Sequence, residues 1–310
     1  MIRLPTAIEL VEVGPRDGLQ SVREFVPTAT KIELIRQLYD AGIRRMEVTS
    51  FVSEAALPQM ADAAEIVAVA NALAGLDACA LVPTVRHAER ALVAGTRHLA
   101  FVLSASEAHN RSNVRRSPLE SADEFARLVE TIPDGTRLRV NVATAFDCPM
   151  TGRVEAETVL QLLAGLIEIA PGAELALCDT TGRASPLQVA SLFEAAKVRF
   201  PAADRWAFHG HDTYGAGAAN VFAALLAGVR VIDAACAGLG GCPFAPGATG
   251  NVATEDVVWM LDGMGIATGI RLADLCRAAE RIALVPGAQT GGRVRIALAS
   301  RACLQPELTA

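Results

Sequence analysis

The 310-residue sequence lacks several features that mark whole classes of protein. No apolar run reaches the roughly 20 residues that cross a bilayer, so we expect no membrane partner. The formal net charge is -6, which argues against nucleic acid as a partner. No Cys-x-x-Cys pair is present, which argues against structural zinc. Neither end resembles a targeting signal, so we expect a cytoplasmic protein whose seven cysteines are mostly reduced thiols.

Short apolar runs rich in β-formers alternate with longer helical patterns along the whole chain. We predict eight strands, at residues 8–13, 45–49, 77–82, 98–103, 137–143, 174–178, 206–209 and 229–235. Helical spacing marks residues 31–41, 156–169, 187–200, 216–228, 255–264 and 272–284. Apolar strands separated by helices indicate a parallel sheet that is covered on both faces.

These elements favour an α/β fold, a (β/α)₈ TIM barrel with a short C-terminal helical extension. We expect the barrel at residues 1–251 and the extension, packed on it, at 252–310. A doubly wound sheet is the alternative. It is weakened because no Gly-x-Gly-x-x-Gly fingerprint follows the first predicted strand.

Two histidines, His209 and His211, end the seventh predicted strand. Side chains two residues apart on a strand point to the same side, so both imidazoles can bind one cation. The alternative is two unrelated histidines, one in the core and one in solvent. Catalytic groups of a TIM barrel gather at the C-terminal ends of its strands, which is where this pair lies.

Three other predicted strands carry charged side chains inside them or at their ends. Arg16 and Asp17 follow the first strand, where a carboxylate can bind a hard cation and a guanidinium can stabilise an oxyanion. Glu47 lies inside the apolar second strand, needs a partner, and has Arg16 as the obvious one. Asp179 ends the sixth strand, as a proton-transfer or ligand-binding group or equally as the N-cap of the next helix.

A glycine-rich loop, residues 238–251, follows the eighth predicted strand and contains Cys242 near its middle. Such a loop can close over a site and deliver the thiol as acid, base or nucleophile. Asn251, at the end of the loop, offers an amide oxygen to a cation. Imidazole, carboxylate and amide donors together suit Mg²⁺ or Mn²⁺. A basic stretch at 111–116 is either a solvated loop or a contact for the phosphates of an acyl carrier.

Four segments carry a family resemblance. They read Gly-Pro-Arg-Asp-Gly-Leu-Gln at 14–20, Glu-Val-Thr-Ser-Phe-Val-Ser at 47–53, His-Gly-His-Asp-Thr-Tyr-Gly at 209–215 and Ala-Gly-Leu-Gly-Gly-Cys-Pro at 237–243. In their residues and in their order along the chain, these motifs resemble those of 3-hydroxy-3-methylglutaryl-CoA (HMG-CoA) lyase, which belongs to the metal-dependent TIM-barrel lyases and synthases. The resemblance runs from about residue 8 to 285.

This resemblance implies cleavage of HMG-CoA to acetyl-CoA and acetoacetate, with an acyl-CoA substrate, a divalent cation, and a place in leucine degradation and ketone-body formation. It implies site roles for the matching residues: the metal ligands Asp17, His209, His211 and Asn251, the enolate-stabilising Arg16, the loop thiol Cys242, the acidic Glu47 and Asp179, and Gln20 on the substrate side. Asp17, His209 or a bound water would accept the hydroxyl proton.

The sequence departs from the family's usual pattern at Gly210, between the paired histidines, and at Ala176–Asp179 and Asn141–Cys148. The segment Ser106–Asn110 looks more like the related synthases. These departures leave open another 3-hydroxyacyl-CoA substrate, such as citramalyl-CoA or a longer 3-alkyl-3-hydroxyglutaryl-CoA. A condensing synthase fits less well, because the sequence has no room for the further C-terminal region that such synthases usually carry. A carboxyltransferase fits less well, because the sequence shows no biotin-attachment region. The alternative from another class is a non-catalytic barrel that binds an acyl-CoA or a metal. We also expect a homo-oligomer from the apolar C-terminal segment.

Overall fold

Eight parallel strands close into a barrel in the computed structural model, which describes residues 4–241 and 250–304. Around the barrel the strands lie in the order β1-β10-β9-β8-β5-β4-β3-β2. Their bounds are β1 (Glu9–Glu12), β2 (Arg45–Ser50), β3 (Asp77–Val82), β4 (His98–Ser104), β5 (Arg137–Ala143), β8 (Glu174–Asp179), β9 (Trp206–Gly210) and β10 (Val231–Ala234). The predicted TIM barrel is confirmed, with each predicted strand end within two residues, and the doubly wound alternative is wrong.

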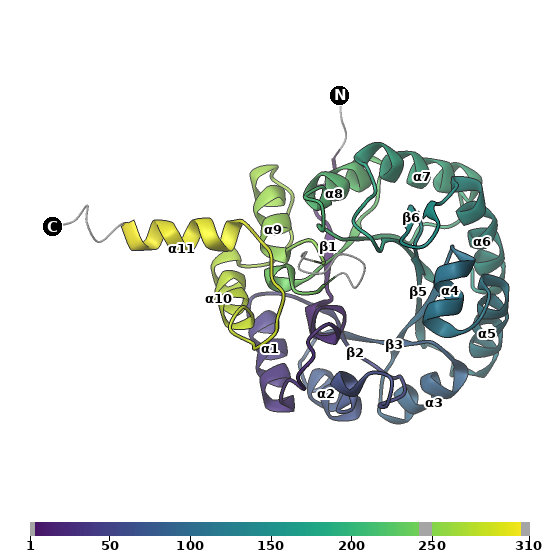
Figure 1. Ribbon diagram of the computed structural model, residues 1–310, viewed down its shortest axis with the longest axis horizontal. Helices are drawn as coiled ribbons and strands as arrows, with labels where there is room; N and C mark the ends of the chain where they lie inside the picture. Colours follow the sequence, from purple (N-terminus) through teal and green to yellow (C-terminus); the bar gives the residue numbers. More distant parts are fainter. Residues whose placement is uncertain (1–3, 242–249, 305–310) are drawn as a thin grey trace.

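Helices surround the barrel (Figure 1). Their bounds are α1 (Thr28–Asp40), α2 (Ala63–Asn71), α3 (Val85–Val93), α4 (Glu107–Val114), α5 (Pro118–Thr131), α6 (Ala156–Ile169), α7 (Pro186–Arg199), α8 (Gly217–Leu226), α9 (Thr254–Gly263), α10 (Leu272–Ile282) and α11 (Val294–Leu304). Local sequence fixes some of their starts. Ser117 and Ser185 each form a capping box in front of a proline, which opens α5 and α7.

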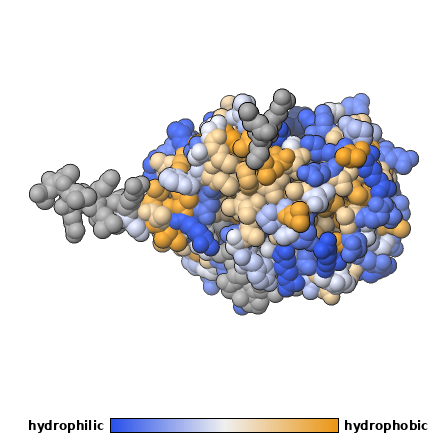
Figure 2. All heavy atoms as spheres, turned by 90° about the horizontal axis from the view of Figure 1, so that it is seen from above, coloured by the Kyte–Doolittle hydropathy of each residue, from blue (hydrophilic) through white to orange (hydrophobic). Residues whose placement is uncertain are grey.

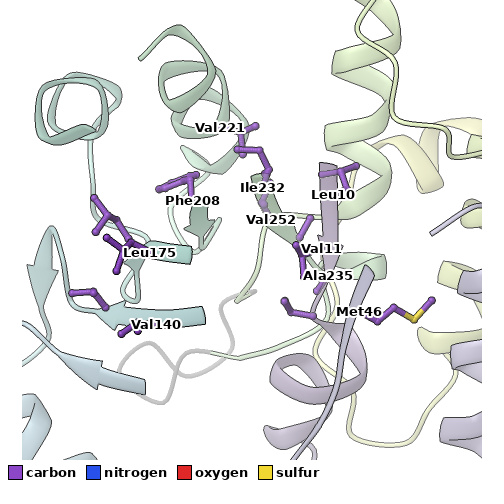
Figure 3. Packing of buried hydrophobic residues seen from close by; sticks show 14 of the residues in the cluster. Leu10, Val11, Met46, Val140, Leu175, Phe208, Val221, Ile232, Ala235 and Val252 are labelled. Carbon is purple, nitrogen blue, oxygen red and sulfur yellow. The ribbon is translucent and has the colours of Figure 1, made fainter. Parts of the chain in front are cut away.

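One face of each strand packs against these helices. Figure 3 shows Leu10, Val140, Leu175, Phe208 and Ile232, which come from five strands, in the apolar cluster of buried residues. All five are at most 4% exposed, so this layer between strands and helices supplies the main hydrophobic core.

The opposite face points into the barrel and is charged at several positions. Arg139 of β5 is 2% exposed; it donates to Glu174 of the neighbouring strand β8 at 2.9 Å and reaches across the barrel to Asp233 of β10. Arg45 of β2 binds Glu174 through two bonds of 2.6 and 2.9 Å. Branched aliphatic residues usually fill this space in TIM barrels. Here a connected set of ion pairs fills part of it instead.

The C-terminal segment differs from the expectation in one respect. The two predicted helices are present as α9 and α10, but α11 was not predicted, and it extends away from the body (Figure 1). The predicted division after residue 251 stays a prediction. The next α-helix after β10 is α9, which stands beside α8 in the place of an eighth barrel helix. No helix among the described residues is long and apolar enough to span a membrane.

Candidate active site

A tight π-helical turn, η1 (Gly14–Gly18), ends β1 and carries Arg16 and Asp17. The amides of Asp17 and Gly18 both return to the carbonyl oxygen of Val13, at 2.7 and 3.3 Å. Glycine is required at position 18, because a Cβ there would lie 2.8 Å from the Leu239 side chain. The turn therefore holds both charged side chains at the C-terminal end of the barrel.

The two imidazoles leave β9 beside Asn251. His211 forms an isolated β-bridge with Asn251, and the amide of Val252 donates to Gly210 O at 3.0 Å. The departure at Gly210 has a local cause: a Cβ there would lie 2.7 Å from the ring of Phe208, which packs on the outer face of the barrel. A larger residue at 210 would require a smaller one at 208.

These segments bring the predicted metal ligands together. Ligand atoms of Asp17, His209 and His211 all lie within 4.8 Å of one another. Asn251 donates from Nδ2 to Asp17 Oδ2 at 2.8 Å and to Leu239 O at 3.1 Å, which fixes the orientation of its amide.

Two atoms of the cluster are buried without a hydrogen-bond partner among the described residues, Asn251 Oδ1 and His211 Nδ1. Buried polar atoms nearly always have partners, so orphans mark a position for an ion or water. Oxygen and imidazole nitrogen donors around one point suit Mg²⁺ or Mn²⁺. The residues present therefore fit a divalent cation.

The electrostatics of the cluster favour cation binding. Burial would raise the pKa of Asp17, but the neighbouring Arg16 and the two histidines hold it well below its ordinary value, so Asp17 is a carboxylate. Burial, reinforced by the charge of His209, lowers the pKa of His211 to about 4, so this imidazole is neutral near pH 7. Its Nε2 lies 3.9 Å from Asp17 Oδ2, beyond hydrogen-bond distance.

Arg16 and Glu47 form the ion pair that the sequence predicted. The Arg16 Nε donates to Glu47 Oε1, and Arg16 Nη1 donates to Asp17 Oδ1 at 2.6 Å. Burial lowers the pKa of Arg16, but both carboxylates outweigh it and raise that pKa above its ordinary value. Glu47 thus orients a permanently charged guanidinium directly beside the ligand Asp17.

The sequence reasoning missed Asp233, which lies behind His209. Asp233 Oδ2 accepts a bond from His209 Nδ1 at 3.1 Å and another from Arg139. Burial would lower the pKa of His209, but this bond and the charges of Asp17 and Asp233 raise it. Because Nδ1 is engaged, Nε2 is the nitrogen left for a cation. The sequence does contain a signal for these interior ion pairs. Three charged residues interrupt apolar strands in the way that Glu47 does: Arg139, Glu174 and Asp233.

Replacing Asp233 with asparagine should weaken Mn²⁺ binding by about 10- to 100-fold, the usual effect of losing a partner behind a metal-ligating histidine. The amide keeps the shape of the carboxyl but removes the charge that makes His209 a stronger donor. Isothermal titration of the metal-free variant with Mn²⁺ measures the loss. Asp147→Asn, outside the cluster, is the control, and affinity within threefold of the parent would contradict the assigned role.

The other predicted site residues lie as follows. Gln20 is exposed and donates to Asp17 Oδ1 at 2.9 Å, so it lies beside the cluster. Cys242 lies outside the described residues. Arg111, in the basic stretch, pairs with Glu107 at 2.8 Å on the surface, so a role toward phosphates stays a prediction.

Asp179 is not brought into the cluster. It lies on the face of β8 that it shares with Leu177, which packs in the outer core, and its Oδ2 accepts a bond from Ala184 N at 3.2 Å. It does not cap the next helix, because that cap is Ser185. Burial raises the pKa of Asp179 to about 6. Because its carboxyl lies outside the cluster, a catalytic role for Asp179 stays a prediction.

Comparison with known proteins identifies relatives over almost the whole chain. A family model described as HMGL-like matches residues 7–282. HMG-CoA lyase of Pseudomonas mevalonii is 40% identical over 296 residues, covering 95% of this chain and 98% of the relative. The (R)-citramalyl-CoA lyase of Chloroflexus aurantiacus is 41% identical over 292 residues, covering 91% and 92%. A mitochondrial HMG-CoA lyase of Arabidopsis thaliana is 39% identical over 96% of this chain, which spans 64% of that relative's length.

Solved structures agree with this assignment. HMG-CoA lyase of Pseudomonas aeruginosa matches with a TM-score of 0.91 at 39% identity, covering 96% of this chain and 99% of that one. An HMG-CoA lyase of Acinetobacter baumannii, solved with coenzyme A and 3-methylmalate, matches with a TM-score of 0.88 at 37% identity, covering 95% and 96%. The resemblance carried by the four motifs is confirmed, and this chain belongs to the HMGL-like family.

Proposed function

We propose that this protein is a carbon–carbon lyase that cleaves HMG-CoA to acetyl-CoA and acetoacetate with the help of a divalent cation. One observation carries the proposal. A carboxylate, two imidazoles and an amide whose Oδ1 has no partner among the described residues converge at the C-terminal end of the barrel, and the guanidinium of Arg16 lies against that carboxylate. Relatives near 40% identity that are named HMG-CoA lyases support the substrate.

Asp17, His209, His211 and Asn251 would hold the cation, Mg²⁺ or Mn²⁺. When bound, such a cation polarises the substrate's oxygens and lowers the pKa of its tertiary alcohol. The hydroxyl proton would go to Asp17 or to a bound water, because Asp233 engages Nδ1 of His209 and the cation would take its Nε2. Loss of that proton allows the bond between C2 and C3 to break, which leaves a ketone and a thioester enolate.

Arg16 would stabilise that enolate. Its charge is permanent, and its Nε is fixed by Glu47, so the guanidinium is oriented before the substrate arrives. The enolate carbon then needs a proton to become acetyl-CoA. We assign its delivery to the thiol of Cys242, on the motif that the sequence shares with the family.

Another 3-hydroxyacyl-CoA is the second candidate substrate, for two reasons. A (R)-citramalyl-CoA lyase is as similar to this chain as the HMG-CoA lyases are. Two positions that depart from the family pattern, Asn141 and Cys178, face the barrel interior: Asn141 Nδ2 lies 3.5 Å from Glu47, and Cys178 packs with Ala176 and Ala207. Cys178 is level with His209 in the sheet, and Asn141 lies two residues before the end of β5.

Cleavage assays on the purified protein test the proposal. The panel is HMG-CoA, citramalyl-CoA and a longer 3-alkyl-3-hydroxyglutaryl-CoA, each with Mg²⁺, with Mn²⁺, and after EDTA. We expect acetoacetate from HMG-CoA at the highest kcat/KM, loss of activity with EDTA and recovery on adding back the metal. A higher kcat/KM for another thioester would support the second candidate. No cleavage of any member would contradict both.

We also propose that the protein assembles as a homo-oligomer. Figure 2 shows apolar surface at the end of the body from which α11 extends, and Ile296 of α11 is 58% exposed. Exposed apolar surface of this kind is typical of interaction sites. Light scattering coupled to gel filtration measures the mass, and a monomer at micromolar concentration would contradict the assembly.

A further inference from the structure

A buried carboxyl group that has no part in the proposed chemistry lies behind the turn that carries Asp17. Glu12 is the last residue of β1 and is fully buried on the outer face of the barrel. Its Oε1 accepts bonds from Gly14 N and Cys236 N, both at 2.8 Å, and its Oε2 accepts one from Thr254 Oγ1 at 2.7 Å. One carboxyl thus joins three segments that are far apart in sequence.

Each of these segments leads to the cluster. Gly14 begins η1, the turn that carries Asp17. Cys236 begins η3 (Cys236–Gly238), which leads to Leu239, whose carbonyl oxygen accepts from Asn251 Nδ2 at 3.1 Å. Thr254 begins α9, three residues after Asn251. Glu12 therefore fixes the backbone on both sides of the contact between Asp17 and Asn251.

A second buried carboxyl, Glu255, supports the same turn. Its Oε2 accepts from Ala237 N at 3.0 Å, so consecutive amides of η3 each bind a different carboxyl group. Ala237 has φ 60° and ψ 16°, a left-handed conformation that costs a non-glycine residue energy unless its surroundings hold it. Consecutive amides in such a turn form a concave anion-binding site, which Glu12 and Glu255 fill from within the protein.

We propose that Glu12, with Glu255, is a positioning residue for the metal site: it holds η1 and η3 at the separation that lets Asp17 and Asn251 bind one cation. The inference rests on the proposed metal-dependent function. It predicts that losing the Glu12 carboxyl weakens metal binding more than it weakens the fold.

The first variant to compare with the parent is Glu12→Gln, whose side chain has the same shape as that of glutamate. In Glu12→Gln the amide oxygen can accept from both backbone amides, and its NH₂ group can donate to Thr254 Oγ1. Burial raises the pKa of Glu12 to about 7, so a neutral group is tolerated at this position. We expect Glu12→Gln to bind Mn²⁺ within threefold of the parent and to keep its electron paramagnetic resonance spectrum.

Glu12→Ala removes all three bonds. We expect its Mn²⁺ affinity to fall by about 10- to 100-fold, with an altered Mn²⁺ spectrum, as for partners that orient metal ligands. Thr254→Val, which removes only one bond, should lie between the parent and Glu12→Ala and serves if the alanine variant does not fold. Glu124→Ala is the matched control: it removes a buried carboxyl that accepts from a backbone amide, Val85 N, away from the cluster.

The outcomes separate this inference from the function on which it rests. If the parent protein binds no Mn²⁺, the proposed metal site fails. If the parent binds Mn²⁺ and both Glu12→Ala and Thr254→Val bind it equally well with the parent's spectrum, Glu12 serves only the fold and the inference is overturned. Loss of affinity in Glu124→Ala as large as in Glu12→Ala would also overturn it, because the effect would then follow from general destabilisation.

Discussion

Alanine at His211 should leave a folded protein that no longer binds its cation. We expect Mn²⁺ affinity to fall by more than about 100-fold. Loss of a residue that only hydrogen-bonds to a metal ligand already lowers metal affinity by about 10- to 100-fold, and His211 is itself a proposed ligand. Turnover should fall with it. The metal-free fold should persist, because the ring makes no hydrogen bond to the described residues and its buried Nδ1 has no partner.

Thermal unfolding with and without Mn²⁺ measures both effects. The parent should gain about 2.7 kcal/mol of stability at a cation concentration 100 times its dissociation constant, and the variant should gain none. His87→Ala is the control, because this histidine lies on α3, away from the cluster. A His211→Ala protein that Mn²⁺ still stabilises as much as it does the parent would remove His211 from the ligand set.

Much of this site was accessible from sequence because the fold converts order along the chain into proximity. The apolar runs around residues 8–13 and 206–209 are separated by most of the chain, yet both end at the same mouth of the barrel. Once the parallel barrel was predicted, Asp17, His209 and His211 had to meet there. The pairing of Glu47 with Arg16 followed in the same way, because a carboxylate inside an apolar strand needs a cation.

The other features of the site could not be predicted, because they depend on which face of a strand a residue occupies and on which residue lies across the barrel from it. Asp179 ends a strand as Asp17 follows one, but it shares the outer face of β8 with Leu177, so its carboxyl turns toward Ala184. Asp233 and Arg139 meet across the interior, from strands that are neither adjacent in sequence nor paired. Periodicity indicates that such residues are buried, but it does not identify their partners. The start of α11 is held by bonds from Arg293 N and Val294 N to the Asp256 carboxylate of α9, contacts that no local sequence pattern encodes.

Glutamine at Arg16 should lower kcat by about 10³-fold or more while the cation stays bound. Removing one donor to a developing oxyanion costs about 2.7–4 kcal/mol, and Arg16 also supplies a full charge. Metal affinity should hold or rise, because the guanidinium that now competes for Asp17 Oδ1 at 2.6 Å is gone. Single-turnover rates at saturating metal, together with a Mn²⁺ titration, separate the two effects.

Stability needs its own control in this experiment, since Arg16→Gln also leaves Glu47 buried without its cation. Breaking a buried pair by removing one partner costs about 3–5 kcal/mol, so the single variant should unfold at lower urea concentration. The double variant Arg16→Gln/Glu47→Gln removes the stranded charge and should recover much of that stability, but its kcat should stay as low as in the single variant. Recovery of kcat along with stability would mean that Arg16 acts on the fold. A single variant whose kcat stays within tenfold of the parent would mean that the charge on the enolate is stabilised by other groups.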